Sequence, residues 1–371
     1  MAALTTPFLA PTACHAQSPF THRKSATVGS SRRCFTVCRA ALQPSLRSTE
    51  TLRPVRGEVA ASAPATVANL GPGFDWLGCA VEGPGDTVVA VPLPTARPGE
   101  IVIQRVTGEG GRLSLDPVKN CAGIAAAATL RAMGAPLACG VGLTLHKGLP
   151  LGSGLGSSAA SAAAAAVAVN ELFGAPLSPM DLVLPGLESE AAVSGYHADN
   201  IAPALLGGFV LIRSCEPLDV QRLAFPGGDV WFALVNPCFE APTAEMRAAL
   251  RSEVPMAELT RNCAAGASLV AGILLGDAGL LGRSLDADVV VEPVRGPLIP
   301  GFAAVKAAAR GAGAYGCTIS GAGPTAVAVV PDPDTGARVA EAMSAAFKRA
   351  GNLDTNSAQV VRLNQQGARK V

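Results

Sequence analysis

The first 49 residues contain no aspartate and no glutamate, and the first acidic side chain is Glu50. This segment is rich in Ser, Thr, Ala and Pro and has no clear Arg-rich amphipathic helix, a composition typical of a chloroplast rather than a mitochondrial transit peptide. It also lacks a long Lys/Arg run and interleaved aromatic residues, which weighs against the alternative, a basic arm that binds nucleic acid. We therefore predict that residues 1–49 are a transit peptide, cleaved near residues 37–41, and that the mature protein lies in the plastid stroma. The basic side chains of the segment are Arg23, Lys24, Arg32, Arg33, Arg39 and Arg47.

Two further absences narrow the class of protein. No apolar run is long and clean enough to span a bilayer, since the alanine-rich segment stops at Asn170 and Glu171. Of 29 Lys and Arg, six lie in the presequence, which leaves 23 against 28 Asp and Glu, a net charge of −5. A mildly acidic body argues against a nucleic-acid or membrane-surface partner.

Cysteine pairs with metal-site spacing are also missing. Ten cysteines are present, but Cys14, Cys34 and Cys38 lie in the presequence, and the other seven form no CxxC pattern. Seven is an odd number, and the spacing suits no metal. We therefore expect buried, reduced thiols.

The order of predicted elements is mixed. Helices and strands do not alternate strictly as in a doubly wound sheet, so an α+β fold is favoured. A length of 371 residues suits two cores, and a glycine- and proline-rich break near Pro226 predicts domains at residues 50–225 and 226–371. Ser178 is the expected N-cap of one helix, with Pro179 at its first position. We expect strands at residues 57–62, 86–93, 100–106, 140–145, 207–213, 229–235, 316–320, 325–330 and 358–363, and helices at residues 120–133, 157–173, 178–190, 243–250, 258–275, 301–311 and 334–348.

Residues 150–166, PLGSGLGSSAASAAAAA, place glycine at every second position before two serines and an alanine run. A strand, a glycine loop and a helix in this order point backbone N–H groups and the helix dipole at an anion. The segment is not a P-loop, because no lysine follows Gly156, and not a dinucleotide fingerprint, because position 157 is serine. The remaining alternative is that the small residues only allow close helix packing. The local sequence leaves both interpretations open.

Three other segments are unusually polar or glycine-rich. Residues 64–75 carry Asn69 and Asp75 on either side of two glycines and a proline, and residues 316–325 run from a strand into a second glycine turn. Residues 188–200 form a dense polar cluster in an apolar region, where isolated charges are costly. Taken singly, each has an ordinary explanation as a cap, a structural histidine or a turn. The polar residues of this cluster include Glu188, Glu190, His197, Asp199 and Asn200.

In order and spacing, these four segments resemble the signature motifs of the GHMP kinases, named after galactokinase, homoserine kinase, mevalonate kinase and phosphomevalonate kinase. Residues 68–75, 197–203 and 318–324 are most similar to the homoserine kinases, and the resemblance covers most of residues 57–330. It implies the GHMP kinase fold, with a ribosomal-protein-like first α+β domain, a ferredoxin-like second α+β domain and the active site between them. It further implies ATP and L-homoserine as substrates, Mg²⁺ as cofactor, O-phospho-L-homoserine as product in threonine and plant methionine synthesis, and a homodimer.

The resemblance also implies residue roles on the nucleotide side. Ser158 and Glu190 match the Mg²⁺ ligands, and Glu188 is the alternative because the interval from Glu190 to His197 is one residue shorter than in some relatives. Asn120 and Lys147 resemble further nucleotide-side positions. The triphosphate is expected over Pro150, Leu151, Gly152, Ser153, Gly154, Leu155, Gly156, Ser157, Ser158, Ala159 and Ala160.

On the acceptor side, Arg247 and Arg295 match carboxylate-binding arginines, and Asp75 would pair with the ammonium group. Asn69, Asn200 and Asp199 are the expected catalytic residues. His197 is expected to lie beside the substrate, together with Asn69 and Asn200. Some superfamily members have an aspartate that acts as general base at a position where homoserine kinases have asparagine. The resemblance therefore implies that a phosphate oxygen takes the proton of the acceptor hydroxyl. Asp199 as general base is the minority hypothesis.

Three rival functions remain. Another GHMP kinase with an uncharged acceptor would have no need of the two arginines, and a non-catalytic sensor should have lost the Mg²⁺ ligands or the loop serines. An NAD-binding oxidoreductase is opposed by Ser157 in place of the third fingerprint glycine.

Overall fold

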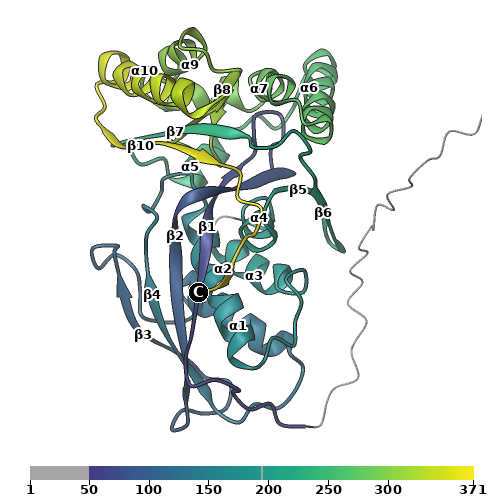
Figure 1. Cartoon of the computed structure of the whole chain (residues 1–371), viewed down its shortest axis with the longest axis vertical. Helices are drawn as coiled ribbons and strands as arrows, with labels where there is room; N and C mark the ends of the chain where they lie inside the picture. The colour runs from purple at the N-terminus through teal and green to yellow at the C-terminus, as the bar shows by residue number, and fades with distance from the viewer. Residues whose placement is uncertain (1–49, 194) are drawn as a thin grey trace, which may run out of the picture. The chain divides into compact units, whose positions relative to one another are not determined.

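The computed structural model describes residues 50–193 and 195–371. The predicted transit peptide and its cleavage site lie outside these residues. Within them, a seven-stranded sheet has the order β11-β1-β2-β4-β3, and β5 pairs with β2 and β6 (Figure 1). All its pairs are antiparallel except β3 with β4. Its strands are β1 (Val59–Ala68), β2 (Leu77–Leu93), β3 (Ile101–Thr107), β4 (Gly140–His146), β5 (Phe209–Cys215), β6 (Leu218–Leu223) and β11 (Arg369–Lys370).

Helices cover this first sheet. α2 packs directly on β1 and β2, and α1 and α3 pack against α2 and against each other (Figure 1). α2 is apolar on nearly all sides and is buried on nearly all sides, as such a helix must be. Its alanines let it approach the alanine-rich β1 closely. The helices are α1 (Cys121–Ala132), α2 (Ser157–Leu172), α3 (Val183–Val193) and α4 (Ile201–Leu206).

A four-stranded antiparallel sheet of order β10-β7-β9-β8 organises the later part of the chain. α9 and α10 lie side by side on it, and α7 packs against β8 and β9 as well as against α6 (Figure 1). The strands are β7 (Trp231–Pro237), β8 (Gly316–Ile319), β9 (Ala326–Val330) and β10 (Thr355–Arg362). The helices are α5 (Thr243–Ala248), α6 (Met256–Leu275), α7 (Ala278–Leu285), α8 (Glu292–Arg295), the 3₁₀ turn η1 (Gly296–Leu298), α9 (Phe302–Gly311) and α10 (Pro333–Gly351).

The expected α+β class is confirmed, and most expected elements are present with shifted ends. β2 begins at Leu77 rather than at residue 86, because its pairing with β1 continues past a register shift between Pro64 and Ala65. The glycines and proline of residues 83–85 indicated a strand end, but they lie at this irregularity. The sequence did not predict α4, β6, α7, α8 or β11, which are all short.

α3 begins at Val183, five residues later than expected. Ser178 is not its N-cap. Instead, the Ser178 hydroxyl donates to Asp181 Oδ2 at 2.7 Å and accepts from the Asp181 amide at 3.2 Å, which closes a turn before the helix. The capping signal was real, but it belongs to that turn.

Residues after β10 return to the first sheet. The Asn364 amide donates to Ala80 O at 2.9 Å, and β11 pairs Lys370 with Ala61. We propose that the domain boundary lies near residue 226, between β6 and β7, so that residues 50–225 and 226–371 form the two domains. The C-terminal nine residues of the second then complete the sheet of the first.

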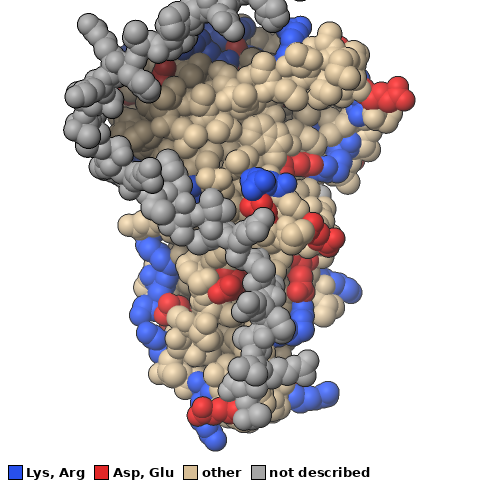
Figure 2. Space-filling model, turned by 90° about the vertical axis from the view of Figure 1, so that its right-hand side faces the viewer, with Lys and Arg blue, Asp and Glu red and all other residues tan. Residues whose placement is uncertain are grey.

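The helices, the surface charges and the cysteines can be compared with the sequence arguments against a membrane span, a nucleic-acid partner and a cysteine metal site. Among the described residues, no helix combines the length and the apolar character needed to cross a bilayer. On the face in Figure 2, basic and acidic side chains of the described residues are interspersed, and a broad upper area carries few charges. The seven described cysteines are all free, but Cys238 and Cys263 are exposed, so the expectation of buried thiols is wrong for these two.

Candidate active site

The four sequence segments meet at one cleft of about 540 Å³, a volume within the roughly 300–1,000 Å³ of ligand pockets. Part of the lining comes from residues 69–200, which precede β7 in the chain. The rest comes from residues that follow β7, including residues of α5, α8 and the turn between β8 and β9. Four of the residues expected around the triphosphate do not line it. Leu155, Ala159 and Ala160 are buried behind the loop, and Pro150 borders a neighbouring pocket. The expected residues that do line the cleft are Asn69, Asp75, Asn120, Lys147, Leu151, Gly152, Ser153, Gly154, Gly156, Ser157, Ser158, Glu190, His197, Asp199, Asn200, Arg247 and Arg295.

The glycine loop leads directly into α2. Gly152, Gly154 and Gly156 have φ values of +64°, +78° and +64°, the region that favours glycine. At Gly156 a side chain is also excluded by space, because a Cβ would lie 1.9 Å from Thr66 Oγ1. Gly156 precedes the helix and has no side chain to cap it, so the amides of the first turn are available to an anion.

The second glycine turn, residues 320–325, is hydrogen-bonded to this loop. The Ser320 hydroxyl donates to Gly154 O at 2.7 Å, and the Thr325 hydroxyl donates to Ser153 O at 2.6 Å. These bonds fix two carbonyl groups of the loop. The turn, whose alternative interpretation was purely structural, both supports the loop and lines the cleft through residues 321–323.

Two arginine side chains, Arg247 and Arg295, line the cleft. Arg247 forms a bidentate ion pair with Asp75, with Nη1–Oδ2 at 2.9 Å and Nη2–Oδ1 at 2.8 Å. Arg295 is 2% exposed, and its Nε donates to the Met246 carbonyl at 3.0 Å. Burial, together with the like charge of Arg247, lowers the pKa of Arg295 to about 10, whereas the hydrogen bond to Asp75 raises the pKa of Arg247. Both arginines remain charged at neutral pH.

Phe74 connects these two arginines, and the sequence reasoning did not single it out. The guanidinium carbons of Arg247 and Arg295 lie 5.2 Å and 4.9 Å from the centroid of its ring. Cations at this distance from an aromatic face are attracted by the ring quadrupole. The only sequence signal was an aromatic residue directly before the predicted ammonium-binding Asp75.

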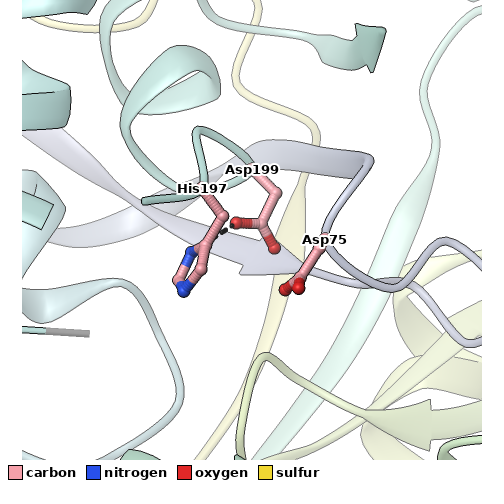
Figure 3. Close-up of side chains that lie close together, drawn as sticks. All are labelled: Asp75, His197 and Asp199. Carbon is pink, nitrogen blue, oxygen red and sulfur yellow. Dashed lines mark ion pairs between the residues drawn. The ribbon is translucent and has the colours of Figure 1, made fainter. Parts of the chain in front are cut away.

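Asp75, His197 and Asp199 offer ligand atoms within 4.8 Å of one another (Figure 3). His197 Nδ1 lies 3.2 Å from Asp199 Oδ1, and Asp199 is 2% exposed. Two carboxylates and an imidazole provide a place for a cation, either an ammonium group or a metal ion. The adjoining guanidinium of Arg247 favours the weaker charge of an ammonium group.

The two expected catalytic asparagines have structural partners as well as cleft positions. Asn69 Nδ2 donates to Gly321 O at 2.8 Å, and its Oδ1 accepts from the Asp75 amide at 3.0 Å. Asn200 Oδ1 accepts from the hydroxyl of Thr66 at 2.7 Å. Asn69 therefore links the first segment to the second glycine turn.

The two candidate metal-ligating glutamates differ in position. Glu190 is 1% exposed, and its Oε1 accepts from the Ser158 hydroxyl at 3.0 Å in the cleft. Glu188 is half exposed, pairs with Arg131 and does not line the cleft. A hydroxyl and a carboxylate are hard oxygen donors of the kind that Mg²⁺ prefers, so the pair Ser158 and Glu190 fits that ion.

Asn120 and Lys147 line the cleft but are engaged in the protein. Asn120 caps α1 by accepting from the Ala122 amide at 3.0 Å, and its Nδ2 donates to Ser114 O at 2.9 Å. The Lys147 ammonium contacts Asp86, which the sequence reasoning also missed. An acidic residue within an apolar strand was the signal that would have identified it.

These features match a known class. Residues 119–208 match the family model of the GHMP kinase N-terminal domain, and residues 269–349 match that of the GHMP kinase C-terminal domain. A homoserine kinase of Arabidopsis thaliana is 58% identical over 335 residues, which cover 90% of each chain. The chain therefore belongs to the GHMP kinase family, and its fold is the GHMP kinase fold. Within that family it belongs to the homoserine kinases.

Other relatives agree. A homoserine kinase of Chloroherpeton thalassium is 42% identical over 81% of this chain and 95% of its own. The crystal structure of a homoserine kinase from Cytophaga hutchinsonii superposes with a TM-score of 0.79 at 39% identity, covering 85% of this chain and 98% of that one. Mevalonate kinase of L. major, crystallised with R-mevalonate, has a TM-score of 0.65 at 17% identity over 85% of this chain and 99% of its own, which shows a shared fold only.

Proposed function

We propose that this protein transfers the γ-phosphoryl group of ATP to the side-chain hydroxyl of L-homoserine, giving ADP and O-phospho-L-homoserine, a step of threonine and plant methionine synthesis. The observation that carries the proposal is the pairing of Asp75 with Arg247 beside Arg295 in the cleft that also holds the glycine loop. A carboxylate and two guanidinium groups are what an amino-acid zwitterion requires. The identity to curated homoserine kinases supports the same substrate.

The nucleotide is proposed to lie with its triphosphate over residues 150–160. The amides at the start of α2 and the positive end of the helix dipole attract the phosphates. Ser158 and Glu190 would hold Mg²⁺, which neutralises charge on the β- and γ-phosphates when bound. The burial of Glu190 in the cleft supports it over Glu188.

The acceptor is proposed to bind with its carboxylate on Arg247 and Arg295 and its ammonium group on Asp75. Asn69, His197 and Asn200 surround it. Phosphoryl transfer is stabilised mainly by alignment and charge, so a phosphate oxygen can take the hydroxyl proton without a dedicated base. Asp199 faces His197 at 3.2 Å and would keep that imidazole oriented.

A coupled ADP-release assay with homoserine, mevalonate, galactose and shikimate tests the proposal. We expect turnover with homoserine and none above background with the other three. Turnover on one of the others, with none on homoserine, would assign a different GHMP kinase activity. No turnover on any of them, with ATP still bound, would favour the non-catalytic sensor.

Two properties of the mature protein are part of the proposal. We propose a homodimer, supported by the exposed apolar side chains Met256, Leu259, Leu274 and Leu275 of α6, and a molar mass measured by light scattering tests it.

We also propose import into chloroplasts, supported by the composition of residues 1–49. Fusion of residues 1–49 to a fluorescent protein should direct it to plastids, and a cytosolic signal would contradict this.

A further inference from the structure

A buried ammonium group lies beneath the glycine loop. The Lys147 side chain is 1% exposed and forms an ion pair with Asp86, whose side chain is fully buried. Lys147 Nζ also lies 2.8 Å from Ser157 O, 2.7 Å from Ser157 Oγ and 2.9 Å from Ser161 Oγ. An ammonium group has three N–H donors, and these four acceptors are enough to use all of them. Lys147 therefore has no donor left for a nucleotide.

The Asp86 carboxylate binds the chain where it enters the loop, at residues 148 and 149. Its Oδ1 accepts from the amides of Gly148 at 3.0 Å and Leu149 at 3.2 Å. Its Oδ2 accepts from the Ser161 hydroxyl, within the first two turns of α2, at 2.6 Å. One carboxylate on β2 thus holds the chain that enters the loop and the helix that leaves it.

Ser157 links the end of the loop to its beginning and to the ion pair. Its hydroxyl donates to Leu149 O at 3.2 Å while its carbonyl and hydroxyl oxygens accept from Lys147. Residues 149 and 157, the two ends of the loop, are joined to each other and to the same buried ion pair. Between them lie three glycines at positive φ, the residue type with the most conformational freedom to lose.

We propose that Asp86 and Lys147 are a positioning pair that holds both ends of the glycine loop in the geometry that receives the triphosphate. Lys147 acts through Asp86, Ser157 and Ser161, and not by contact with the nucleotide. Preorganising a loop in its bound conformation improves affinity by reducing the ordering cost at the time of binding. The proposal rests on the proposed function for the identity of the nucleotide, and not for that of the acceptor.

A double-mutant cycle separates positioning from direct contact. Asp86→Asn and Lys147→Met should each weaken MgATP binding and lower kcat/KM for ATP by about 10–100-fold, with the KM for homoserine changed less than about threefold. Because both residues act as one unit, the double variant should lose no more than the worse single variant. Losses that multiply in the double variant would make Lys147 an independent nucleotide ligand and overturn the proposal.

A milder variant covers the case in which a broken buried ion pair prevents folding. Ser161→Ala removes a hydroxyl that contacts both charges and leaves the pair intact. It should raise the Kd for MgATP about 3–10-fold. Thr129→Val is the matched control, since it removes a buried hydroxyl of α1 that donates to Ala125 O at 2.8 Å and lies outside the cleft. Equal Kd values for the two variants would overturn the proposal.

The Kd for MgATP is measured by calorimetry on the whole protein without an acceptor. This measurement keeps the two proposals distinguishable. If homoserine is not phosphorylated, the proposed function fails, while the Kd values still report whether the ion pair positions the loop. If homoserine is phosphorylated but Ser161→Ala and Thr129→Val bind MgATP equally, only the positioning pair fails.

Discussion

Arg247 and Asp75, 172 positions apart in the chain, form a bidentate ion pair with N–O distances of 2.8 Å and 2.9 Å. They are also the side chains that we propose to receive the two charged groups of the amino-acid substrate. A zwitterion that binds between them replaces one ion pair by two of the same kind. A molecule that carries only one of the charges would leave a partly buried group unpaired, so we expect the pair to select for zwitterions.

Asp75→Asn and Arg247→Ala should therefore raise the KM for homoserine and leave the KM for ATP within about twofold. A hydrogen bond to a charged group contributes about 1.5–3 kcal/mol, which corresponds to roughly 10–150-fold in affinity. Steady-state kinetics with each substrate varied in turn measure this. Arg213→Ala, which breaks a comparable ion pair with Asp219 on the surface, is the control and should change neither constant. An equal rise in the KM for ATP would contradict the assignment.

Phe74→Leu should raise the KM for homoserine about 3–10-fold, because cation–π contacts contribute about 0.5–2 kcal/mol. The ring faces both Arg247 and Arg295, so its loss leaves both guanidinium groups less well oriented. Phe74→Tyr keeps the aromatic face and should restore the KM. If Leu and Tyr variants behave alike, the ring serves only as packing.

Glu190→Gln and Ser158→Ala should increase the Mg²⁺ concentration needed for half-maximal turnover, since the first removes the negative charge of a proposed ligand and the second removes the oxygen of the other. We expect at least about a tenfold loss of kcat for Glu190→Gln, because Mg²⁺ neutralises the charge that develops on the transferring phosphoryl group. Activity titrated against free Mg²⁺ provides the measurement. Glu188→Gln is the matched control, and a loss as large as that of Glu190→Gln would transfer the ligand role to Glu188.

Asp199→Asn should keep turnover within a few-fold of the unaltered protein, because positioning and charge carry most of the stabilisation in phosphoryl transfer. The pH dependence of kcat should also keep its shape. A loss of 10²-fold or more, the range of general acid–base catalysis, would establish Asp199 as the base.

Thiol alkylation at pH 8 should modify Cys238 and Cys263 and spare Cys121, although Cys121 lines the cleft. Burial, reinforced by the charge of Glu190, raises the pKa of Cys121 to about 11. A raised pKa leaves little thiolate below pH 9, and the thiolate is the reactive form. Peptide mass spectrometry after iodoacetamide treatment reads out the labelled positions. Rapid labelling of Cys121 would show that the cleft is more open than the structure indicates.

The sequence was most informative where chemistry and spacing are local. The start of α2 at Ser157, directly after the glycine loop, was predicted correctly because alternating glycines favour a turn and serines favour a helix start, and both signals are local. The pairing of Ser158 with the buried Glu190 was expected from the resemblance, and the structure places their side-chain oxygens 3.0 Å apart.

The sequence did not predict which residues far apart in the chain contact each other. Asp75 and Arg247 were expected to bind opposite ends of a substrate, and nothing in the sequence indicated that they contact each other. Lys147 was expected beside the nucleotide, but its partner Asp86 lies 61 positions away on β2. Such contacts depend on the register between β2 and β4, which pairs Thr87 with His146, and a register is decided by the whole sheet.

β11 lies beside the first strand of the sheet, and the amide of Val371 donates to Ala60 O at 3.0 Å. The final residue and the start of β1 are therefore near neighbours, which is the geometric condition for circular permutation. A short linker from residue 371 to about residue 56 would close residues 56–371 into a ring. New termini could then be opened in an exposed turn that does not line the cleft, such as that between β2 and β3, without loss of the edge pairing that β11 provides.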